Sequence, residues 1–414
     1  MKLTDDETAI AAGRDGEGAA VALRLVADSG RLLGADALVP VASAHIDGCL
    51  YHGDSGTEFA EFLVAKGARV TVPATLNVGA LDLLRPGNVR LAGGRREMAL
   101  RLMRAYEALG CRSTWTCAPY QAGHRPALGS DVAWGESNAV VFCNSVLGAR
   151  TNRYGDFLDI ACAIAGRAPH YGLHLLANRR ATVRVDTSGI SEALKRKEAF
   201  WPVLGAWLGR TVGEDVAVID GLAAYATEDR LKALGAAAAS TGAVALFHVA
   251  GVTPEAPTAE SILADRHATI ALTPDAVRDA RKLLSTAGGD AVDAVAVGSP
   301  HFSLDEILSL DALLAGRRVR VPIYLNTSRH VLGKLERAGR LAALTEAGVV
   351  PIVDTCVVVT PILPAGGGVL MTNSGKFAFY APGNTGYAVQ FGSLADCVES
   401  AVAGRLVRDE AGWQ

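Results

Sequence analysis

The chain has 414 residues, a formal net charge of −3 and a composition that is 50% hydrophobic but only 6% aromatic. The length is enough for two or three domains. The small charge gives no indication of nucleic-acid binding, and no window approaches the roughly 20 uninterrupted apolar residues of a membrane span. The N-terminus carries acids at once and has no signal-peptide apolar region, so a cytoplasmic enzyme is expected. Alanine, valine and 45 glycines favour an α/β fold packed with small residues.

The first half is predicted to open with a helical pattern over residues 4–33, and Thr4 with Glu7 forms a capping box at its start. A short strand, a turn-rich segment and the end of a βα unit follow at 38–42, 43–53 and 68–79. The turn-rich segment holds two histidines, an aspartate and a cysteine. This combination is unusual, and it marks the segment as a candidate for function.

The second half alternates strands with helices, which implies a parallel sheet covered on both faces. Strands are predicted at 215–220, 242–250, 293–297, 318–325 and 349–353, with helices at 227–239, 303–314 and 328–339. The loops after the strands are then expected at one rim of the sheet. That rim would carry His248, the Ser299-Pro300-His301 turn, residues 326–329 and residues 354–356.

Residues 116–153 combine many polar side chains with apolar runs such as 139–142. The window holds the thiol of Cys117, the isolated acid Glu136 and the cation Arg150. Buried polar groups need partners, so a convergent polar set beside one thiol indicates a metal-assisted active site. Its amides and hydroxyls belong to Ser137, Asn138, Asn144, Ser145, Thr151 and Asn152.

The seven cysteines are odd in number and widely spaced, which excludes a disulfide framework, and no C-x-x-C pair is present. Cys162 and Cys397 occupy helix-like apolar positions and fit small buried hydrophobes. Cys117 and Cys356 each follow a threonine, and Cys356 ends a β-rich run. Strand ends are where α/β enzymes place their chemistry.

Near the C-terminal end, Asn373-Ser374-Gly375-Lys376 follows a glycine-rich segment that is predicted to be a flexible loop. It is not a P-loop, because the spaced upstream glycine is absent. Lys376 is either an anion holder presented from a tight turn or an exposed turn lysine.

Taken together, these segments resemble the aconitase X proteins, a divergent branch of the aconitase superfamily. The motifs TCAPY, AW-x-ESNAVVFCNSVLGARTNR, YGLH, GSPH, DTC and NSGKFAFY occur in the family's order. The resemblance runs from the first helix to Gly404. It implies an aconitase-like arrangement of α/β/α domains with mostly parallel sheets, which we divide into an N-terminal α/β region, 1–205, and a C-terminal one, 206–414.

The activities known in this family are dehydrations. Bacterial members convert cis-3-hydroxy-L-proline to Δ1-pyrroline-2-carboxylate, and archaeal members dehydrate mevalonate 5-phosphate. The resemblance also implies a small swivelling domain, fused or encoded as a separate subunit, that closes over the site and supplies a catalytic serine. The chain lacks it, so we expect a large subunit that joins a small one in a heteromer.

The resemblance further implies an iron or iron–sulfur centre, with Cys117 and Cys356 as its best thiolate ligands. Archaeal members carry G-C-P-H where this chain has Ser299, which leaves the third ligand open between Cys49 and Glu136, with Cys143 behind. A structural pairing of Glu136 with Arg150 or Arg153 is the alternative for that acid.

The expected mechanism has a metal acting on the substrate hydroxyl as a Lewis acid and a base removing the proton alpha to the carboxylate. Arg150 and Lys376 would hold the carboxylate. His45 and His301 are candidates for proton traffic or support of the metal, although a lone histidine is more often structural. The catalytic set is Glu136, His45, His301, Lys376 and Ser374, and further hydrogen bonds would come from Asn77, Ser137, Thr151, Asn152 and Ser374.

Three alternatives remain open. One is the mevalonate 5-phosphate reaction, which we disfavour because the motif segments hold few spare basic residues for a phosphate and GSPH resembles the bacterial branch. The second is a non-catalytic scaffold subunit that binds a small partner. The third is a metal-free enzyme that uses Cys117 as a nucleophile with His301.

Overall fold

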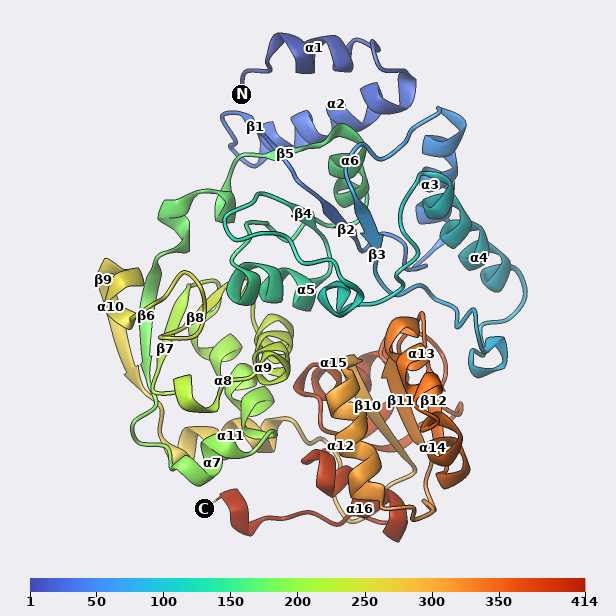
Figure 1. The fold of residues 1–414 in the computed structure, drawn as a ribbon, viewed down its shortest axis with the longest axis vertical. Coiled ribbons are helices and arrows are strands. Elements are labelled where there is room, and N and C mark those ends of the chain that lie inside the picture. Colours follow the sequence, from blue (N-terminus) through green and yellow to red (C-terminus); the bar gives the residue numbers. More distant parts are fainter. Residues whose placement is uncertain (414) are drawn as a thin grey trace. The chain divides into compact units, whose positions relative to one another are not determined.

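The computed structural model describes residues 1–413 and shows a chain of two compact units (Figure 1). Unit 1 comprises residues 1–81 and 91–180, and unit 2 comprises residues 82–90 together with those from 181 onward. The units therefore divide at 180/181, whereas the expected division at 205/206 falls inside helix α8 (Phe200–Val212). None of the helices within residues 1–413 has the length and apolar character that crossing a membrane requires.

The N-terminal helical pattern forms two helices, α1 (Asp5–Ala11) and α2 (Glu17–Leu32), rather than one. Between them Gly13 and Gly16 adopt φ angles of 103° and 98°, a region that only glycine enters readily, so the helix must end there. The predicted capping box is confirmed: Thr4 caps α1 and the Glu7 side chain returns to the Thr4 backbone.

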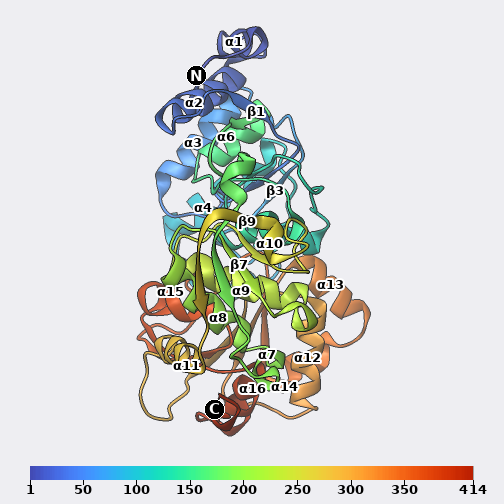
Figure 2. The ribbon, with the colours of Figure 1, turned by 90° about the vertical axis from the view of Figure 1, so that its left-hand side faces the viewer.

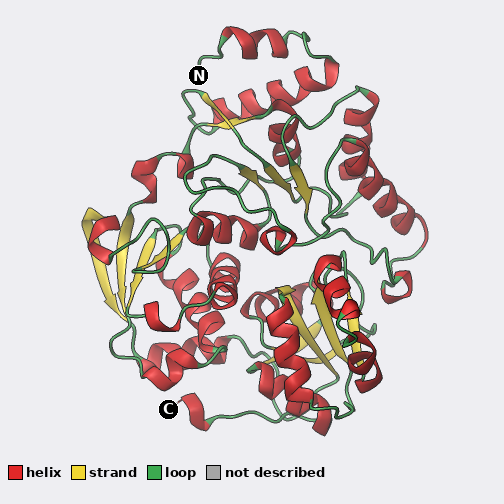
Figure 3. Ribbon diagram, in the orientation of Figure 1, coloured by secondary structure: helices red, strands yellow, loops and turns green. Residues whose placement is uncertain are grey.

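Unit 1 is built around a small parallel sheet of strand order β3-β2-β4, shown as yellow arrows in Figure 3. Each strand has only two or three residues: β2 (Ala44–Ile46), β3 (Ala74–Leu76) and β4 (Ala133–Trp134). The antiparallel pair of β1 (Leu38–Pro40) and β5 (Arg167–Pro169) lies beside helix α2. The other α-helices of the unit are α3 (Asp54–Ala65), α4 (Gly93–Ala108), α5 (Ser137–Phe142) and α6 (Leu158–Ala165).

Unit 2 contains two parallel sheets, whereas the sequence predicted one. The first has the order β8-β7-β6-β9, with β6 (Ala181–Asp186), β7 (Ala217–Asp220), β8 (Phe247–Val249) and β9 (Leu263–Ala271). The second has the order β12-β11-β10-β13-β14, with β10 (Ala294–Phe302), β11 (Ile323–Thr327), β12 (Val349–Ile352), β13 (Gly368–Thr372) and β14 (Tyr387–Phe391). The expected common rim is therefore wrong for His248, which lies in β8 of the other sheet.

Helices α8 and α9 (Glu228–Thr241) pack side by side in unit 2 (Figure 2). A Cβ atom at Gly205 would lie 2.2 Å from the Leu234 carbonyl oxygen, so the close approach requires glycine. The remaining α-helices of this unit are α7 (Glu192–Arg196), α10 (Ala259–Ile262), α11 (Pro274–Leu283), α12 (Leu304–Leu314), α13 (Arg329–Arg337), α14 (Leu341–Ala347), α15 (Gly375–Thr385) and α16 (Leu394–Ala403).

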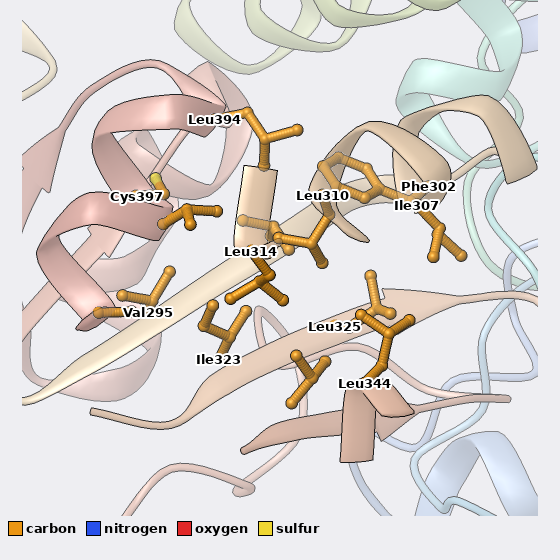
Figure 4. Close-up of a cluster of buried hydrophobic side chains, with 14 of the residues drawn as sticks. Val295, Phe302, Ile307, Leu310, Leu314, Ile323, Leu325, Leu344, Leu394 and Cys397 are labelled. Atoms are coloured by element: carbon orange, nitrogen blue, oxygen red, sulfur yellow. The ribbon is translucent and has the colours of Figure 1, made fainter. Parts of the chain in front are cut away.

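A hydrophobic core joins the five-stranded sheet to helices α12 and α16 (Figure 4). Val295 and Ile323 from the strands meet Leu310 and Leu314 from α12. Burying one such side chain stabilises the fold by about 1.5–3 kcal/mol. Cys397 of α16 belongs to this core, and burial raises the pKa of its thiol, which confirms the structural interpretation of that cysteine.

Candidate active site

The carboxyl edge of the β3-β2-β4 sheet in unit 1 gathers the polar residues that the sequence singled out. His45 of β2 stands in register with Thr75 of β3 and with Trp134 of β4. Asn77 follows β3 directly, and Glu136 follows β4 after one glycine. The strands are parallel, so their ends meet at one edge, the usual location of chemistry in open α/β sheets.

A continuous line of side-chain contacts runs through this edge. Nδ1 of His45 lies 2.9 Å from Oγ1 of Thr75, and the same oxygen lies 2.7 Å from Nδ1 of His124. Nε2 of His124 in turn lies 2.8 Å from Oγ of Ser43. The sequence analysis missed Thr75, His124 and Ser43, because no local pattern connects three residues that are 32 and 49 positions apart.

Both histidine rings of this line are neutral at physiological pH. The pKa of His45 is lowered to about 3. Burial is the main cause, His124 contributes to the lowering, and Glu136 acts in the opposite direction. Burial also lowers the pKa of His124 to about 4, together with the charge of Arg112. A neutral imidazole has one donor and one acceptor nitrogen, so each ring can accept or donate according to its tautomer.

Several buried polar atoms at this edge have no hydrogen-bond partner among the described residues. They are Nε2 of His45, Oδ1 of Asn77, Nε1 of Trp134 and Oδ1 of Asn138. Leaving one such atom unpaired costs about 1–3 kcal/mol. A polar ligand bound at this edge would complete hydrogen bonds to these atoms.

Glu136 caps helix α5 at the same edge. Its Oε2 accepts from the Ala139 N–H at 2.7 Å and from the Asn138 amide, and its Oε1 accepts from the Ser137 hydroxyl at 3.2 Å. A carboxylate at a helix N-terminus is stabilised by the exposed N–H groups and the helix dipole. The sequence analysis predicted no helix cap at Glu136, because glutamate is not among the usual capping residues.

Most polar groups of the segment from Asn144 to Asn152 form hydrogen bonds that stabilise the segment's own conformation. Asn144 and Thr151 exchange two hydrogen bonds, of 2.9 and 3.0 Å, and Asn152 bonds to the backbone of Tyr171 and Leu173. Arg179, only 1% exposed, donates to both oxygens of Asn144. Arg179 is a scaffold residue that the sequence analysis missed, since its partners lie about 35 positions away.

The structure also distinguishes the candidate thiols. All seven cysteines are buried, and none of them forms a disulfide. The Cys49 sulfur lies 3.4 and 3.5 Å from the carbonyl oxygens of Ile46 and Asn77, and burial with the nearby Asp47 and Asp159 raises its pKa well above the usual value. Burial likewise raises the pKa of Cys111, Cys143 and Cys162. These four environments favour the protonated thiol.

Asp159, which the sequence did not single out, organises the loop that holds Cys49. Its carboxylate accepts from the N–H groups of Asp47 at 2.6 Å and of Gly48 at 3.1 Å. The side chain is fully buried, and burial raises its pKa to about 8 against the effect of those hydrogen bonds. Asn77 completes this loop by donating to Asp47.

In unit 2, the carboxyl edge of the five-stranded sheet gathers a second set of predicted residues. Nε2 of His301 lies 3.1 Å from the Thr355 carbonyl oxygen, next to Cys356. Ser374 caps α15 and its hydroxyl also donates to the Ser299 carbonyl, so its proton is engaged. Lys376 stands in the first turn of α15 and is half-buried.

Arg329 and Asp354 brace this second edge. Nε and an Nη of Arg329 each donate to Asp354 at 2.7 Å, a bidentate pair whose carboxylate is fully buried. Asn326 links β11 to the next loop, since it donates to Val297 and accepts from the N–H of Val357. The predicted rim is confirmed at the carboxyl ends of β10, β11 and β12. However, residues 299–301 lie within the end of β10 and residues 326–327 within the end of β11, rather than in loops after these strands, whereas residues 354–356 do follow β12.

The predicted site residues therefore fall into two groups. His45, Asn77, Cys117 and the 136–152 set belong to unit 1, while His301, Cys356, Ser374 and Lys376 belong to unit 2. Within neither unit, as far as residue 413, do three histidine, cysteine or acidic side chains gather as a ready metal site. A polar strand edge with unpaired atoms, carried on parallel α/β domains, defines the class of protein as an α/β enzyme.

Comparison with known families gives the particular family. The aconitase X first, second and third domains match residues 1–177, 180–282 and 292–403. The chain belongs to the aconitase X family, and its α/β fold with parallel sheets is the fold of that family.

Individual relatives align over nearly the whole chain. A cis-3-hydroxy-L-proline dehydratase from Pseudomonas aeruginosa is 42% identical over 419 residues, which cover 100% of this chain and 72% of that protein. A phosphomevalonate dehydratase large subunit from Methanothermobacter thermautotrophicus is 39% identical, over 90% of this chain and 92% of its own. The crystal structure of Thermococcus kodakaraensis aconitase X in its holo-form superposes with a TM-score of 0.87 at 35% identity, covering 97% of this chain and 100% of that one.

Proposed function

We propose that this protein is a hydro-lyase that dehydrates cis-3-hydroxy-L-proline to Δ1-pyrroline-2-carboxylate. The observation that carries the proposal is the 42% identity over the full chain to a dehydratase of that substrate. The unit 1 edge supports it, because unpaired buried donors and acceptors suit a small ligand that carries a carboxylate, an amine and a hydroxyl.

The cofactor proposed for this reaction is an iron or iron–sulfur centre held by Cys117 and Cys356. Neither thiol forms a disulfide, both are about 5% exposed, and thiolates suit such centres. Cys117 belongs to unit 1 and Cys356 to unit 2. When bound, the iron supplies Lewis-acid polarisation of the substrate hydroxyl. We assign Glu136 ahead of Cys49 as the further ligand, because carbonyl oxygens surround the Cys49 sulfur.

The chain's own residues then bind the substrate and move the protons. Arg150 and Lys376 hold the carboxylate as cations. The Nε2 atom of neutral His45 takes the proton alpha to the carboxylate. Asn77 and Ser137 supply hydrogen bonds, while Thr151 and Asn152 fix the backbone that carries Arg150. Ser374 and His301 position the unit 2 loops that hold Cys356 and Lys376.

A small second subunit is part of the proposal. The archaeal relatives are named as large subunits, which suggests a small partner in that branch. Such a subunit would close the site and supply the catalytic hydroxyl, since the Ser374 hydroxyl is already engaged with Ser299. Closing a site excludes water and strengthens its electrostatics. We expect the isolated chain to be nearly inactive, and full turnover by this chain alone would contradict the heteromer.

The experiment that tests the function is an assay of the complex formed by co-expression with the neighbouring small gene product. We expect iron in the purified complex and dehydration of cis-3-hydroxy-L-proline. Cys117→Ser and Cys356→Ser should each remove the iron and the activity, whereas Cys162→Ser, a fully buried thiol of α6, should keep both. Full iron content in Cys356→Ser would refute the ligand assignment.

Mevalonate 5-phosphate is the second candidate substrate, favoured by the 39% identity to a phosphomevalonate dehydratase large subunit. The same complex should be offered both compounds. Turnover of mevalonate 5-phosphate without turnover of the hydroxyproline would reverse the choice of substrate.

A further inference from the structure

We propose that Thr75, His124 and Ser43 form a proton relay that connects Nε2 of His45, at the unit 1 edge, with solvent. The inference deepens the proposed function and rests on it for its catalytic meaning. Its structural basis is the unbroken line of three contacts, of 2.9, 2.7 and 2.8 Å, between four side chains.

The two ends of this line differ in a way that suits transfer. At one end His45 is fully buried and its Nε2 has no partner among the described residues. At the other end His124 is partly exposed, and its partner Ser43, the last group of the line, keeps 7% of its surface accessible to solvent. A relay needs an inner atom free to meet the substrate and an outer end in contact with solvent.

The chemistry of the four groups allows two complementary states. In the first, His45 carries its proton on Nδ1 and donates to Thr75, the Thr75 hydroxyl donates to His124 Nδ1, and His124 Nε2–H donates to Ser43. In the second, every hydrogen bond is reversed and His45 carries its proton on Nε2. Hydroxyls and neutral imidazoles both donate and accept, so each state satisfies every contact.

Proton transfer converts the first state into the second without creating a charge on either ring. Nε2 of His45 accepts the substrate proton while its Nδ1 proton passes to Thr75. The Thr75 proton moves to His124 Nδ1, the His124 Nε2 proton moves to Ser43, and the original Ser43 proton leaves to water. One proton enters and one leaves. In the reverse shift Ser43 takes a proton from water and the Nε2 proton of His45 passes to the hydroxide that leaves the substrate, which departs as water and resets His45 for the next turnover.

Neutrality is what makes the relay necessary. The buried ring of His45 strongly resists becoming a cation, since its pKa lies near 3, and His124 and Glu136 are the titratable groups whose charges act on it. A base that must remain neutral can accept a proton only if it releases another. The Thr75 hydroxyl is the group placed to take that proton.

The kinetic test compares Thr75→Val, which keeps the side-chain shape but removes the hydroxyl, with Thr75→Ser, which restores it. In the complex we expect Thr75→Val to lower kcat about 10- to 100-fold with KM within about twofold, and Thr75→Ser to stay within about threefold of the wild type. Thr71→Val is the matched control, because its hydroxyl contacts only backbone oxygens. Unchanged kcat in a folded Thr75→Val variant would overturn the relay.

A second test is independent of activity and uses the full chain labelled with ¹⁵N-histidine. Ring nitrogen shifts report the tautomers of the nine histidines. We expect Ser43→Ala to change the His45 tautomer ratio in the wild-type background but not in Thr75→Val. An effect of Ser43→Ala that persists in Thr75→Val would refute coupling through the hydroxyl. If the complex dehydrates neither hydroxy acid, the proposed function fails, and the spectra still decide the relay.

Discussion

The unit 1 edge around His45 and the Lys232 cluster of unit 2 are both buried and polar, but they treat their polar groups in opposite ways. Lys232 has a side chain only 2% exposed, and its ammonium donates to Asp229 at 2.9 Å, to the His301 carbonyl at 3.3 Å and to Glu306. At the His45 edge, four buried atoms have no hydrogen-bond partner within residues 1–413.

The electrostatics of the two regions follow from this difference. Burial lowers the pKa of Lys232, but Glu306 and Asp229 outweigh it and hold the pKa above the usual value, so the charge stays. At His45 burial prevails and the ring stays neutral. A paired buried group contributes to stability, whereas an unpaired neutral group costs stability and remains available to a ligand. Buried polarity by itself therefore does not mark a catalytic site.

The largest expected effect is on the catalytic rate, when His45 is replaced. His45→Gln removes the imidazole and should lower kcat of the complex by about 100-fold or more, a usual loss for a proton-transfer group. The folded fraction at pH 7 should stay close to that of the wild type. The control is His267→Gln, an exposed ring of β9. Steady-state kinetics and thermal unfolding of both variants check this, and wild-type kcat in His45→Gln would exclude His45 from the reaction.

Replacing Lys232 should instead lower the free energy of unfolding. Lys232→Met leaves the Glu306 and Asp229 carboxylates without their cation, and breaking a buried pair in this way costs about 3–5 kcal/mol of the free energy of unfolding. Lys282→Met removes an exposed partner of Asp279 and should change stability little. Urea unfolding measures both. A loss below about 1 kcal/mol in Lys232→Met would show that the cluster is not a stabilising element.

The pH dependence of the free energy of unfolding tests whether the His124 ring is held neutral. With a folded pKa of about 4 and an ordinary value of 6.5, the unfolded chain binds a proton between these pH values that the folded chain does not. The free energy of unfolding should therefore fall as pH drops from 6.5 to 4, by about 2–3 kcal/mol after allowance for partial exposure. His124→Gln should remove that part of the slope in urea titrations. An unchanged slope would mean that the ring is not held neutral.

The smallest expected effect lies outside both regions, at the start of α1. Thr4→Ala removes the side chain that caps the helix and should cost about 1 kcal/mol. Thr8→Ala, at an exposed position inside the same helix, should stay within about 0.5 kcal/mol of the wild type. Equal midpoints for the two variants in urea would contradict the capping role.

Local patterns in the sequence were enough for much of the fold. The capping box of Thr4 and Glu7 forms as predicted, and Ser303 with Glu306 forms another, because a capping box involves residues only three positions apart. The alternation of strands and helices fixed the parallel α/β class. In unit 2, strands β6, β9, β13 and β14 were missed, and Gly368, which was predicted to be part of a flexible loop, begins β13.

What the tertiary structure alone decided is which distant residues meet. A run of apolar residues indicates a strand but not its neighbours. For this reason the sequence predicted one sheet where the structure has two, and His248 does not lie at the expected rim. The same limit hid Thr75, His124, Asp159 and Arg179, whose partners lie 30 to 112 positions away. The sequence by itself determined residue types, caps and the family. Only folding placed a hydroxyl between two histidines, because hydrogen-bond geometry depends on strand register, which no local pattern encodes.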